Sequence, residues 1–323
     1  MTDVVVVGGG MSGLACARRV ADAGLSVQVL DRGRRLGGRL GARTFRDLPG
    51  GGEHAADTGG PYCTVSDEDF RQVVDGWVER GLARAWTDTF VTAGPDGLGE
   101  PKTGPVRFSG AAGMRALVED LAEGLDVRSE QTVDADGVEQ LREEARAVVL
   151  AMPGPQAARL LPPQLAAIAD QPYDPSIAVV ARFAERTWAD FDAAFVSETA
   201  VRWLADDGRS RGDGAPVLVA HTTPDAARPL LDDPSSAVGP AVEAMRRILG
   251  IDVDPVETLV QRWTFAQPTE GRDDTFFLTD DGLGLCGDGW AEKSKVEAAW
   301  RSGTDLGEAL AARLTRSARA ESA

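Results

Sequence analysis

Histidine, cysteine and lysine are scarce in this chain of 323 residues. Only 2 histidines and 3 cysteines occur, and Cys16, Cys63 and Cys286 show no C-x-x-C spacing. Zinc and iron–sulfur sites draw on these two residue types, so we expect no metal centre. Unpaired cysteines of this kind also favour a reduced, cytoplasmic setting.

Long apolar runs and an excess of positive charge are missing as well. No stretch approaches the length of a membrane-spanning helix, and the N-terminus lacks the basic region of a signal peptide. The formal net charge is −17, with 34 basic against 51 acidic residues. These features argue against nucleic acid and anionic membranes as partners. An anionic small molecule would have to be held by local arginines and helix ends.

The first 31 residues carry the most informative pattern. Residues 4–7 are an unbroken run of valine, typical of a central parallel strand. Gly8, Gly10 and Gly13 follow with G-x-G-x-x-G spacing, and Asp31 ends a second predicted strand. Glycines let a pyrophosphate approach the start of a helix, and a carboxylate about 20 residues later can bind a ribose. The pattern predicts a dinucleotide site; the alternative is a glycine-rich turn in an unrelated α/β domain.

The segment after Asp31 indicates which dinucleotide. Residues 32–39 form a basic, glycine-rich turn that resembles the G-G-R segment of the flavoprotein class containing amine oxidases and hydroxybenzoate hydroxylase. The resemblance implies FAD rather than NAD, with Arg39 on the phosphate side. Arg34 and Arg35 are either phosphate contacts or solvated loop charges.

A second glycine-containing turn lies near the C-terminus. Residues 283–290 are predicted to form a strand that ends at Gly287 and Asp288, with a helix from about Lys295 to Arg313. The start of that helix would lie near a phosphate or the flavin. The Asp288 carboxylate would accept a hydrogen bond from a ribityl or ribose hydroxyl.

The middle of the chain predicts a second sheet. Residues 173–183, 194–205, 215–222 and 256–264 are strand-like runs, expected to form an antiparallel sheet separate from the first. Residues 206–214 are predicted to be a charged, glycine-containing hairpin loop. Further helices are expected over 69–80, 114–123, 156–169 (broken at Pro162 and Pro163) and 237–249. Further strands are expected over 82–91, 126–134 and 146–152. A Gly/Pro loop is expected over 48–52, and a loose hairpin or loop over 92–104.

These elements predict an α/β fold. An FAD-binding, Rossmann-type parallel sheet would carry an inserted α+β substrate domain built on the antiparallel sheet. The FAD domain would be discontinuous, with segments 1–62, 104–155 and 268–323. Segments 63–103 and 156–267 would form the substrate domain.

Several segments resemble the renalase family in order and content, over residues 1 to about 310. They are residues 57–62, 150–153, 200–206, 220–224, 261–263 and 286–290. The resemblance implies non-covalent FAD and oxidation of the 2- and 6-dihydro isomers of NAD(P)H, with hydride passing to flavin N5. Dioxygen would then reoxidise the flavin and give NAD(P)+ and hydrogen peroxide. The sequence departs from the family at Pro61, where glutamine is usual, and at Asp31, where glutamate is common in this fold.

The same resemblance names the residues expected to contact FAD. Val133 would do so through its backbone, at the adenine. The full set is Gly8, Gly10, Met11, Ser12, Gly13, Asp31, Arg32, Gly38, Arg39, Gly59, Gly60, Pro61, Val133, Met152, Gly287, Asp288, Lys295 and Val296.

Hydride transfer from a dihydronicotinamide needs stacked rings rather than a protein acid or base, so we expect no catalytic side chain. The substrate-positioning candidates are Tyr62, Trp203, His221 and Trp263. Each of these four also fits ordinary core packing. Arg202 and Arg262 are either phosphate partners of the substrate or solvated charges.

Two other functions stay open. One is an amine oxidase or protoporphyrinogen-type oxidase on the same fold. Amine oxidases usually carry a lysine in the substrate domain, and residues 177–183 and 256–264 contain none, which counts against this alternative. The other is a flavin-bearing binding protein whose catalysis has lapsed.

Overall fold

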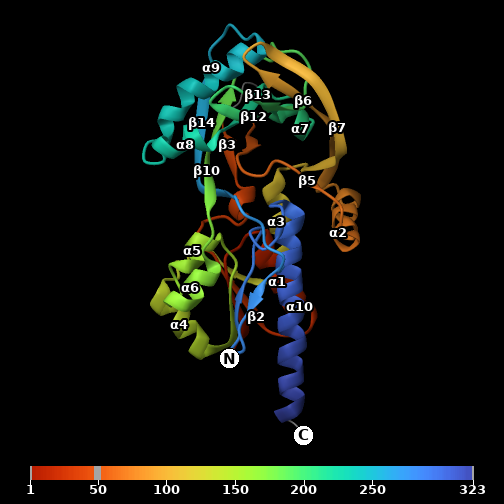
Figure 1. Cartoon of the computed structure of the whole chain (residues 1–323). Coiled ribbons are helices and arrows are strands. Elements are labelled where there is room, and N and C mark those ends of the chain that lie inside the picture. Colours follow the sequence, from red (N-terminus) through yellow and green to blue (C-terminus); the bar gives the residue numbers. More distant parts are fainter. Residues whose placement is uncertain (1, 47–51, 322–323) are drawn as a thin grey trace. The chain divides into compact units, whose positions relative to one another are not determined.

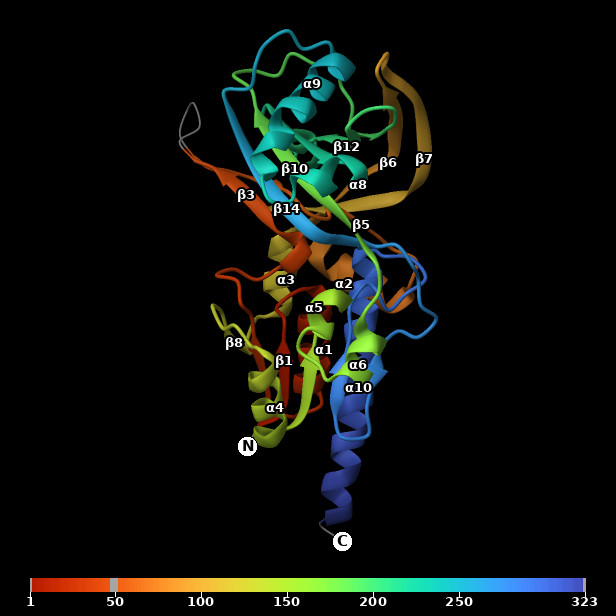
Figure 2. The ribbon, with the colours of Figure 1, turned by 60° about the vertical axis from the view of Figure 1, so that its left-hand side comes forward.

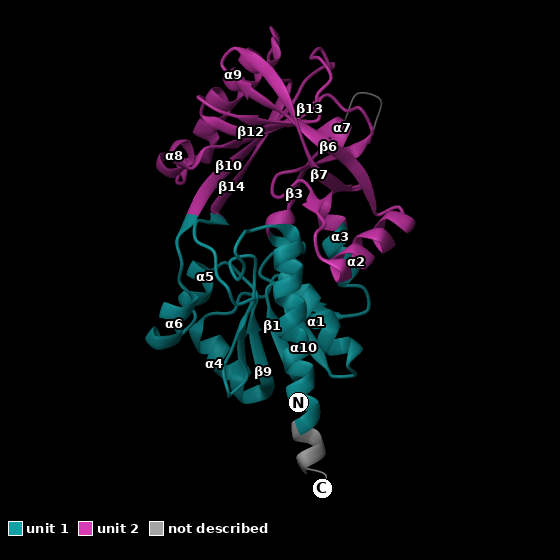
Figure 3. Cartoon of the chain, turned by 45° about the vertical axis from the view of Figure 1, so that its right-hand side comes forward, with its two compact units in different colours: residues 1–38, 117–173, 267–323 teal, residues 39–116, 174–266 magenta. Residues whose placement is uncertain are grey.

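The computed structural model describes residues 2–46 and 52–321, so the loop expected at 48–52 lies almost wholly outside the described residues. The chain divides into two compact units (Figure 3). Unit 1 comprises residues 1–38, 117–173 and 267–323, and unit 2 comprises residues 39–116 and 174–266.

Unit 1 is built on a six-stranded sheet with the order β15-β16-β9-β1-β2-β8. All neighbours are parallel except β15 and β16, which confirms the predicted Rossmann-type parallel sheet. The strands are β1 (Thr2–Val7), β2 (Val27–Leu30), β8 (Asp126–Arg128), β9 (Ala145–Leu150), β15 (Phe277–Leu278) and β16 (Leu283–Leu285).

Helices cover both faces of this sheet (Figures 1 and 2). On one face lie α4 (Ala135–Glu144), α5 (Gly154–Ala158) and α6 (Pro163–Ala169), and on the other α1 (Met11–Asp22) and α10 (Val296–Glu321). Alternate residues of a strand point to opposite faces, so the four valines of β1 can serve both layers. Val7 packs with Val138 of α4 and Ala157 of α5.

Glycines allow α1 and α10 to pack unusually closely. A Cβ atom on Gly303 would lie 1.9 Å from the carbonyl oxygen of Ser12, and one on Gly307 would lie 2.7 Å from that of Cys16. Both distances are far inside van der Waals contact, so only glycine fits at these positions of α10. The close packing places the part of α10 around Gly303 beside the first turn of α1.

Unit 2 is built on an eight-stranded sheet with the order β14-β10-β13-β12-β11-β6-β7-β5. β6 and β11 are parallel, so the sheet is mixed rather than wholly antiparallel as expected. The strands are β5 (Cys63–Thr64), β6 (Ala83–Gly94), β7 (Gly97–Gly110), β10 (Tyr173–Arg182), β11 (Ala193–Val196), β12 (Val201–Asp206), β13 (Val217–Thr222) and β14 (Glu257–Pro268).

The two faces of the eight-stranded sheet carry separate cores. Leu218 and Ala220 of β13 point to the face covered by α9 (Val238–Leu249). Val217 and Val219 point to the opposite face, with Phe45 from the hairpin of β3 (Ala42–Phe45) and β4 (His54–Asp57). The other helices that unit 2 contributes to are α2 (Glu68–Glu79), α3 (Met114–Leu121), α7 (Asp207–Arg211) and α8 (Pro224–Ala227).

The compact units divide the chain differently from the predicted domains. Residues 39–62, expected in the FAD domain, belong to unit 2 because the β3–β4 hairpin packs against the eight-stranded sheet. Residues 104–116 join it because they complete the long strand β7. Residues 156–173 belong to unit 1 because α5 and α6 cover the parallel sheet.

Three local predictions are corrected. The strand expected over 126–134 ends at Arg128, and α4 follows, with Asp134 accepting a hydrogen bond from the Gly137 N–H as a helix cap. Its mostly polar sequence gave no apolar periodicity. The single strand expected over 194–205 is split into β11 and β12, which pair antiparallel around a turn containing Glu198 at φ 59°. The segment 92–104, expected to be a loose hairpin or loop, is a hairpin of β6 and β7 with a register shift between Val91 and Ala93.

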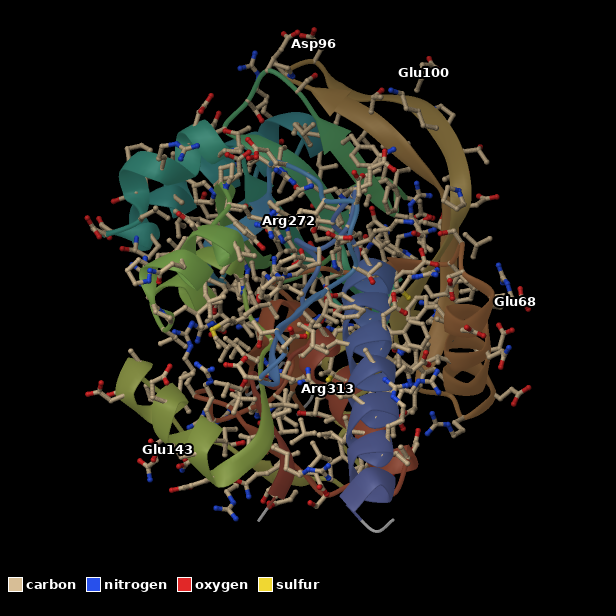
Figure 4. All side chains as sticks on the ribbon, turned by 60° about the horizontal axis from the view of Figure 1, so that its bottom comes forward. Glu68, Asp96, Glu100, Glu143, Arg272 and Arg313 are labelled. Atoms are coloured by element: carbon tan, nitrogen blue, oxygen red, sulfur yellow. The ribbon has the colours of Figure 1, made fainter. Side chains whose placement is uncertain are left out.

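The acidic excess lies on the outside of both units. Glu68 on α2, Asp96 and Glu100 in the β6–β7 hairpin, and Glu143 on α4 are exposed and point away from the ribbon (Figure 4). Surface charge of this kind bears on solubility and long-range fields rather than on the fold. Within the described part of the chain, no helix combines the length and the hydropathy needed to cross a bilayer.

Candidate active site

The glycine motif lies where β1 meets α1 in unit 1. Gly8 has φ +120°, and a Cβ there would lie 2.3 Å from the carbonyl oxygen of Ala151. A Cβ on Gly13 would lie 2.0 Å from the Gly8 carbonyl oxygen. These two glycines are therefore required by the chain's own turn and packing.

Gly10 differs from its neighbours in the motif. It precedes α1 with φ −91°, a conformation that any residue adopts. The only atom near a Cβ at this position would be the Gly38 Cα, at 4.0 Å. Neither backbone conformation nor packing therefore requires glycine here. A bare backbone at a helix start, where the first N–H groups have no partner within the helix, suits a bound phosphate.

Asp31 braces this turn. Its Oδ2 accepts a hydrogen bond from the Gly9 N–H at 2.6 Å, and its Oδ1 accepts one from the Gly33 N–H at 2.7 Å. A carboxylate oxygen can accept more than one hydrogen bond, so a ribose hydroxyl can still be accommodated. Asp31 thus has a structural task that its position in the motif did not reveal.

The C-terminal turn is also supported from within the chain. The Gly287 N–H donates to Ser302 Oγ at 2.9 Å, and the hydroxyl of Ser294 donates to the carboxylate of Asp288, which is 6% exposed. Lys295 Nζ lies 3.0 Å from a carboxylate oxygen of Glu297. The contacts of Asp288 and Lys295 with FAD, and that of Val296 at the start of α10, stay predictions.

The other expected FAD residues of unit 1 lie around the same sheet edge or beside it. Met11 and Ser12 are buried in the first turn of α1, and the Ser12 hydroxyl bonds the thiol of Cys286. Val133 and Met152 are partly buried, and their side chains pack against apolar clusters of unit 1. Arg32 is exposed, and Gly38 has φ +52°.

In unit 2 the turn after β4 is fixed by backbone contacts. The N–H and hydroxyl of Thr58 both donate to the Gly41 carbonyl, each at 3.1 Å, and the Gly60 N–H donates to the Arg39 carbonyl at 3.0 Å. A Cβ on Gly59 would lie 1.7 Å from that Arg39 oxygen. Glycine at position 59 is therefore required by the chain's own packing.

Two of the four substrate-positioning candidates hold this turn. Trp263 Nε1 donates to the Thr58 carbonyl at 2.6 Å, and His221 also hydrogen-bonds the Thr58 backbone. The Trp203 ring lies 5.1 Å from the His221 ring, centroid to centroid. Burial, helped by the charge of Arg202, lowers the pKa of His221 to about 4, so its imidazole is neutral at pH 7.

The fourth candidate, Tyr62, lies in an aromatic cluster on the same face of the eight-stranded sheet. Its ring centroid is 6.2 Å from that of Trp86 and 5.4 Å from that of Phe90, both on β6. We call this surface, with Tyr62, Trp86, Phe90, Trp203 and Leu259, the aromatic face. Trp86 and Phe90 were missed because β6 was expected to be an ordinary strand, although their i, i+4 spacing would have placed both on one side.

Neither arginine considered for the substrate phosphate is directed at the aromatic face by a described contact. The Arg262 guanidinium donates to the Leu231 carbonyl at 2.6 Å, and Arg262 alternates along β14 with Trp263, which puts it on the opposite side. Arg202 is exposed. In the same unit, Arg39 Nη1 donates to the Ala266 carbonyl at 3.3 Å, so its phosphate contact also stays a prediction.

A buried ionic network lies beneath the turn and was not predicted. His54 Nε2 is 2.7 Å from Asp207 Oδ2, and His54 Nδ1 is 2.9 Å from Asp213 Oδ2. Burial opposes protonation of His54, but its hydrogen bonds to Asp207 and Asp213 outweigh this and raise its pKa to about 9. The histidine is therefore an imidazolium at pH 7.

Arg211 and Asp57 continue the network. Arg211 Nη2 lies 3.1 Å from Asp57 Oδ2, and the side chains are 5% and 2% exposed. The Met114 N–H also donates to Asp57, at 3.1 Å. Burial raises the pKa of Asp57 to about 7, while the charge of Arg211 acts in the opposite direction. The network joins β4, α3 and α7 around the start of the turn.

The hairpin loop expected over 206–214 is therefore wrong. The segment forms α7, and Asp206 caps it by accepting from the Arg209 N–H at 3.1 Å. The other carboxylate oxygen of Asp206 accepts from Arg186 and Trp188, each at 2.8 Å. The charges of this segment predicted solvent exposure, but Asp207, Arg211 and Asp213 pair with residues of β4 more than a hundred positions away.

Metal chemistry finds no support in the described residues. No group of three or more His, Cys, Asp or Glu side chains in residues 2–46 and 52–321 is arranged to hold a metal ion.

Two protein-family models match the chain. The model "Flavin containing amine oxidoreductase" matches residues 94–307, and the model "NAD(P)-binding Rossmann-like domain" matches residues 6–77. The second match covers the glycine motif and Asp31. The first covers the C-terminal turn and, of the aromatic face, Trp203 and Leu259.

Known proteins with similar sequence or structure include three oxidases. (S)-6-hydroxynicotine oxidase of Paenarthrobacter nicotinovorans is 52% identical over 50 residues, which is 16% of this chain and only 12% of that protein. Cyclohexylamine oxidase of Brevibacterium oxydans IH-35A has a TM-score of 0.72 at 15% identity, covering 97% of this chain and 99% of that chain. A protein of Exiguobacterium sp. 255-15 assigned as a protoporphyrinogen oxidase gives the same TM-score, identity and coverage. At such identities the structural likeness shows the fold alone.

Proposed function

Since the chain belongs to the family of flavin-containing amine oxidoreductases, it is an FAD-dependent oxidoreductase, and we propose that its electron donor is an isomeric dihydronicotinamide dinucleotide. In this proposal it oxidises 2- or 6-dihydro-NAD(P) with dioxygen. The observation that carries the proposal is the aromatic face of unit 2, which combines flat rings with a buried arginine, Arg107. A buried cation disfavours a protonated amine and suits an anionic dinucleotide.

The residues of unit 1 fit FAD. The bare backbone at Gly10 leaves room for a pyrophosphate at the start of α1. Asp31 and Asp288 present carboxylate oxygens near the glycine turn and near the start of α10, where hydroxyl groups of a dinucleotide can donate. FAD, when bound, supplies the two-electron oxidation and passes the electrons to dioxygen.

The protein's own contribution is positioning and exclusion of water. Trp263 and His221 hold the Thr58 carbonyl, and the neutral imidazole adds no charge beside it. The aromatic face offers a flat apolar wall for a nicotinamide ring. No general acid or base is required, because the donor carbon loses hydride directly.

Two features of the sequence support this donor over an amine. Residues 177–183 and 256–264 lack the lysine that amine oxidases usually carry in the substrate domain. Segments of the substrate domain, such as residues 200–206 and 261–263, resemble renalases in order and content.

Amine oxidation is the second candidate. It is favoured by the family match and by the 50-residue similarity to (S)-6-hydroxynicotine oxidase. The cationic Arg107 on the aromatic face counts against it.

Anaerobic single-turnover mixing separates the two candidates. The FAD-loaded protein is mixed with the 2-, 4- and 6-dihydro isomers of NAD(P) and with a panel of primary and secondary amines, while flavin absorbance is followed. We expect fast bleaching by the 2- or 6-dihydro isomer. The 4-dihydro form should be slower by about 100-fold or more, because its donor carbon is displaced. Fast bleaching by an amine, or preference for the 4-dihydro form, would overturn the proposal.

We also propose that FAD is bound non-covalently. All three cysteines are buried, and burial raises the pKa of Cys286, the one nearest the C-terminal turn, to about 12. A thiol in that state is a poor nucleophile. Acid precipitation should leave the FAD in the supernatant, and flavin retained on the denatured chain would contradict this.

A further inference from the structure

Arg107 of β7 is a buried cation that pairs with no carboxylate in the part of the chain that the structure describes. Arg107 is only 7% exposed. Its Nε and Nη1 atoms are buried and have no hydrogen-bond acceptor among the described residues. Burying a charge without compensation costs several kcal/mol, so proteins rarely leave one unpaired.

Other arginines with buried nitrogen atoms are compensated. Arg211 pairs with Asp57, Arg182 with Glu257, and Arg186 with Asp206. Within the described residues, Arg107 has no such carboxylate.

Aromatic rings surround Arg107 but do not satisfy it. The guanidinium carbon lies 3.9 Å from the Phe90 ring centroid and 5.8 Å from that of Tyr62. Such cation–π contacts compensate part of the charge. They use the flat face of the guanidinium, whereas its N–H donors point outward in the plane. The in-plane donors still need an acceptor.

A second unsatisfied donor lies in the same cluster. The Trp86 Nε1 atom is buried and has no hydrogen-bond partner among the described residues. Its ring centroid is 5.3 Å from that of Phe90 and 6.2 Å from that of Tyr62. Two donors, one of them charged, thus border the same pair of rings. An oxyanion is the complementary group, since it carries only acceptors and a negative charge.

We infer that Arg107 and Trp86 form an oxyanion-binding subsite on the aromatic face, which takes a carboxylate or phosphate group of the substrate. The inference rests on the proposed function insofar as a dihydronicotinamide dinucleotide supplies that group as a phosphate. The fork of the guanidinium binds the oxyanion, the Trp86 N–H adds a neutral hydrogen bond, and Phe90 and Tyr62 hold the guanidinium in place.

Two matched pairs of ligands test the subsite by calorimetry on the FAD-loaded protein. Nicotinamide mononucleotide and nicotinamide riboside differ by a phosphate, and nicotinate and nicotinamide differ by a carboxylate. The wild type should bind the anionic member of at least one pair more tightly. The pair that responds identifies the oxyanion.

Arg107→Gln should weaken binding of that ligand by about 10–100-fold and should not weaken binding of its counterpart without the oxyanion. Arg107→Lys keeps the charge but not the fork, and should fall between wild type and Arg107→Gln. Arg228→Gln, which removes an exposed arginine paired with Asp174, is the matched control and should change neither affinity. Equal affinity for the two members of each pair in wild type, or an unchanged anion preference in Arg107→Gln, would overturn the subsite.

Trp86→Phe tests the subsite even where Arg107→Gln does not fold. It keeps a ring beside Phe90 but removes the N–H, so the affinity for the anionic ligand should fall about 3–10-fold, while that for its counterpart without the oxyanion should not change. An undiminished anion preference in this variant would contradict the Trp86 contact. Failure of the dihydro isomers to bleach the flavin, with the Arg107-dependent anion preference intact, would remove the proposed function and leave the subsite standing.

Discussion

Two arginines are buried in unit 2, one among carboxylates and the other among aromatic rings. Arg211 lies between Asp57 and Asp207, at 3.1 and 3.6 Å, and closes an ionic network. Arg107 lies over Phe90 and has buried N–H groups without acceptors among the described residues. The charge of Arg211 is compensated by carboxylates of the protein, whereas the charge of Arg107 is available to a bound ligand. The comparison separates a structural arginine from one available for recognition.

Removing each arginine should give the largest contrast. Arg211→Met leaves buried carboxylates uncompensated, so we expect a loss of about 3–5 kcal/mol in the free energy of unfolding. Arg107→Met removes a buried unpaired charge and should cost less than about 1 kcal/mol or stabilise the protein. Urea denaturation of both variants measures the difference. Similar losses in the two variants would show that Arg107 is as structural as Arg211.

The pH dependence of stability should follow the ionic network. The pKa of His54 is raised from 6.5 to about 9 in the folded chain, so its contribution is complete below about pH 6.5 and is lost as the pH rises through 9. The loss should reach as much as about 3 kcal/mol. The pKa of Asp57 is also raised, to about 7. Its protonation therefore also stabilises the folded chain at low pH, and this contribution is lost as the pH rises through 7. Denaturation midpoints at pH 6.5, 8 and 9.5 measure this, and His54→Gln should abolish the dependence between pH 8 and 9.5.

The glycine turn of unit 1 permits the same contrast between structural and binding requirements. Gly13→Ala places a Cβ 2.0 Å from the Gly8 carbonyl oxygen and should cost about 1–3 kcal/mol of stability. Gly10→Ala meets no protein atom closer than 4.0 Å, so the apoprotein should unfold at the same urea concentration as wild type. Its affinity for FAD should fall by about 10-fold or more, because the added methyl group would lie where the phosphate meets the backbone. Fluorescence titration of the apoprotein with FAD checks this, and unchanged FAD affinity in Gly10→Ala would remove our placement of the pyrophosphate.

The smallest expected effect concerns the turn at Thr58. Trp263→Phe keeps an aromatic ring but deletes the hydrogen bond to the Thr58 carbonyl, with an expected cost of about 1 kcal/mol. Because Trp263 acts through the turn rather than on the substrate, kcat should fall while the ligand affinities stay close to wild type. A changed affinity for nicotinamide riboside, with kcat unchanged, would instead indicate direct contact with the substrate.

How well a region could be predicted from the sequence depends on whether its contacts are local or link residues far apart in the chain. The glycine turn and Asp31 lie within 31 residues, and their spacing is set by local strand and helix geometry, so the sequence was sufficient to predict them. The parallel sheet and most helices followed from apolar periodicity. The sequence could not show which glycines are required by the packing of the chain and which by a ligand. That distinction depends on contacts such as the one between Gly59 and Arg39.

The aromatic face and the ionic network could be predicted only in part. The structure brings Tyr62, Trp203, His221 and Trp263 together, each in a strand or directly beside one, and their role toward a substrate stays a prediction. Their detailed roles depend on pairing between residues far apart in sequence. His54 and Asp207 are separated by 153 positions, and no local pattern reports such a contact. The charge of residues 206–213 pointed to a solvated loop, and tertiary pairing overrode that preference.

The close packing of α1 against α10 has a consequence for how the protein is made. β1 and α1 are synthesised before α10, whose Gly303 and Gly307 receive the Ser12 and Cys16 backbone. The nascent α1 therefore has one face uncovered until α10 has been made. Burial of that face then depends on a contact between segments far apart in sequence, which makes it a slow, late step.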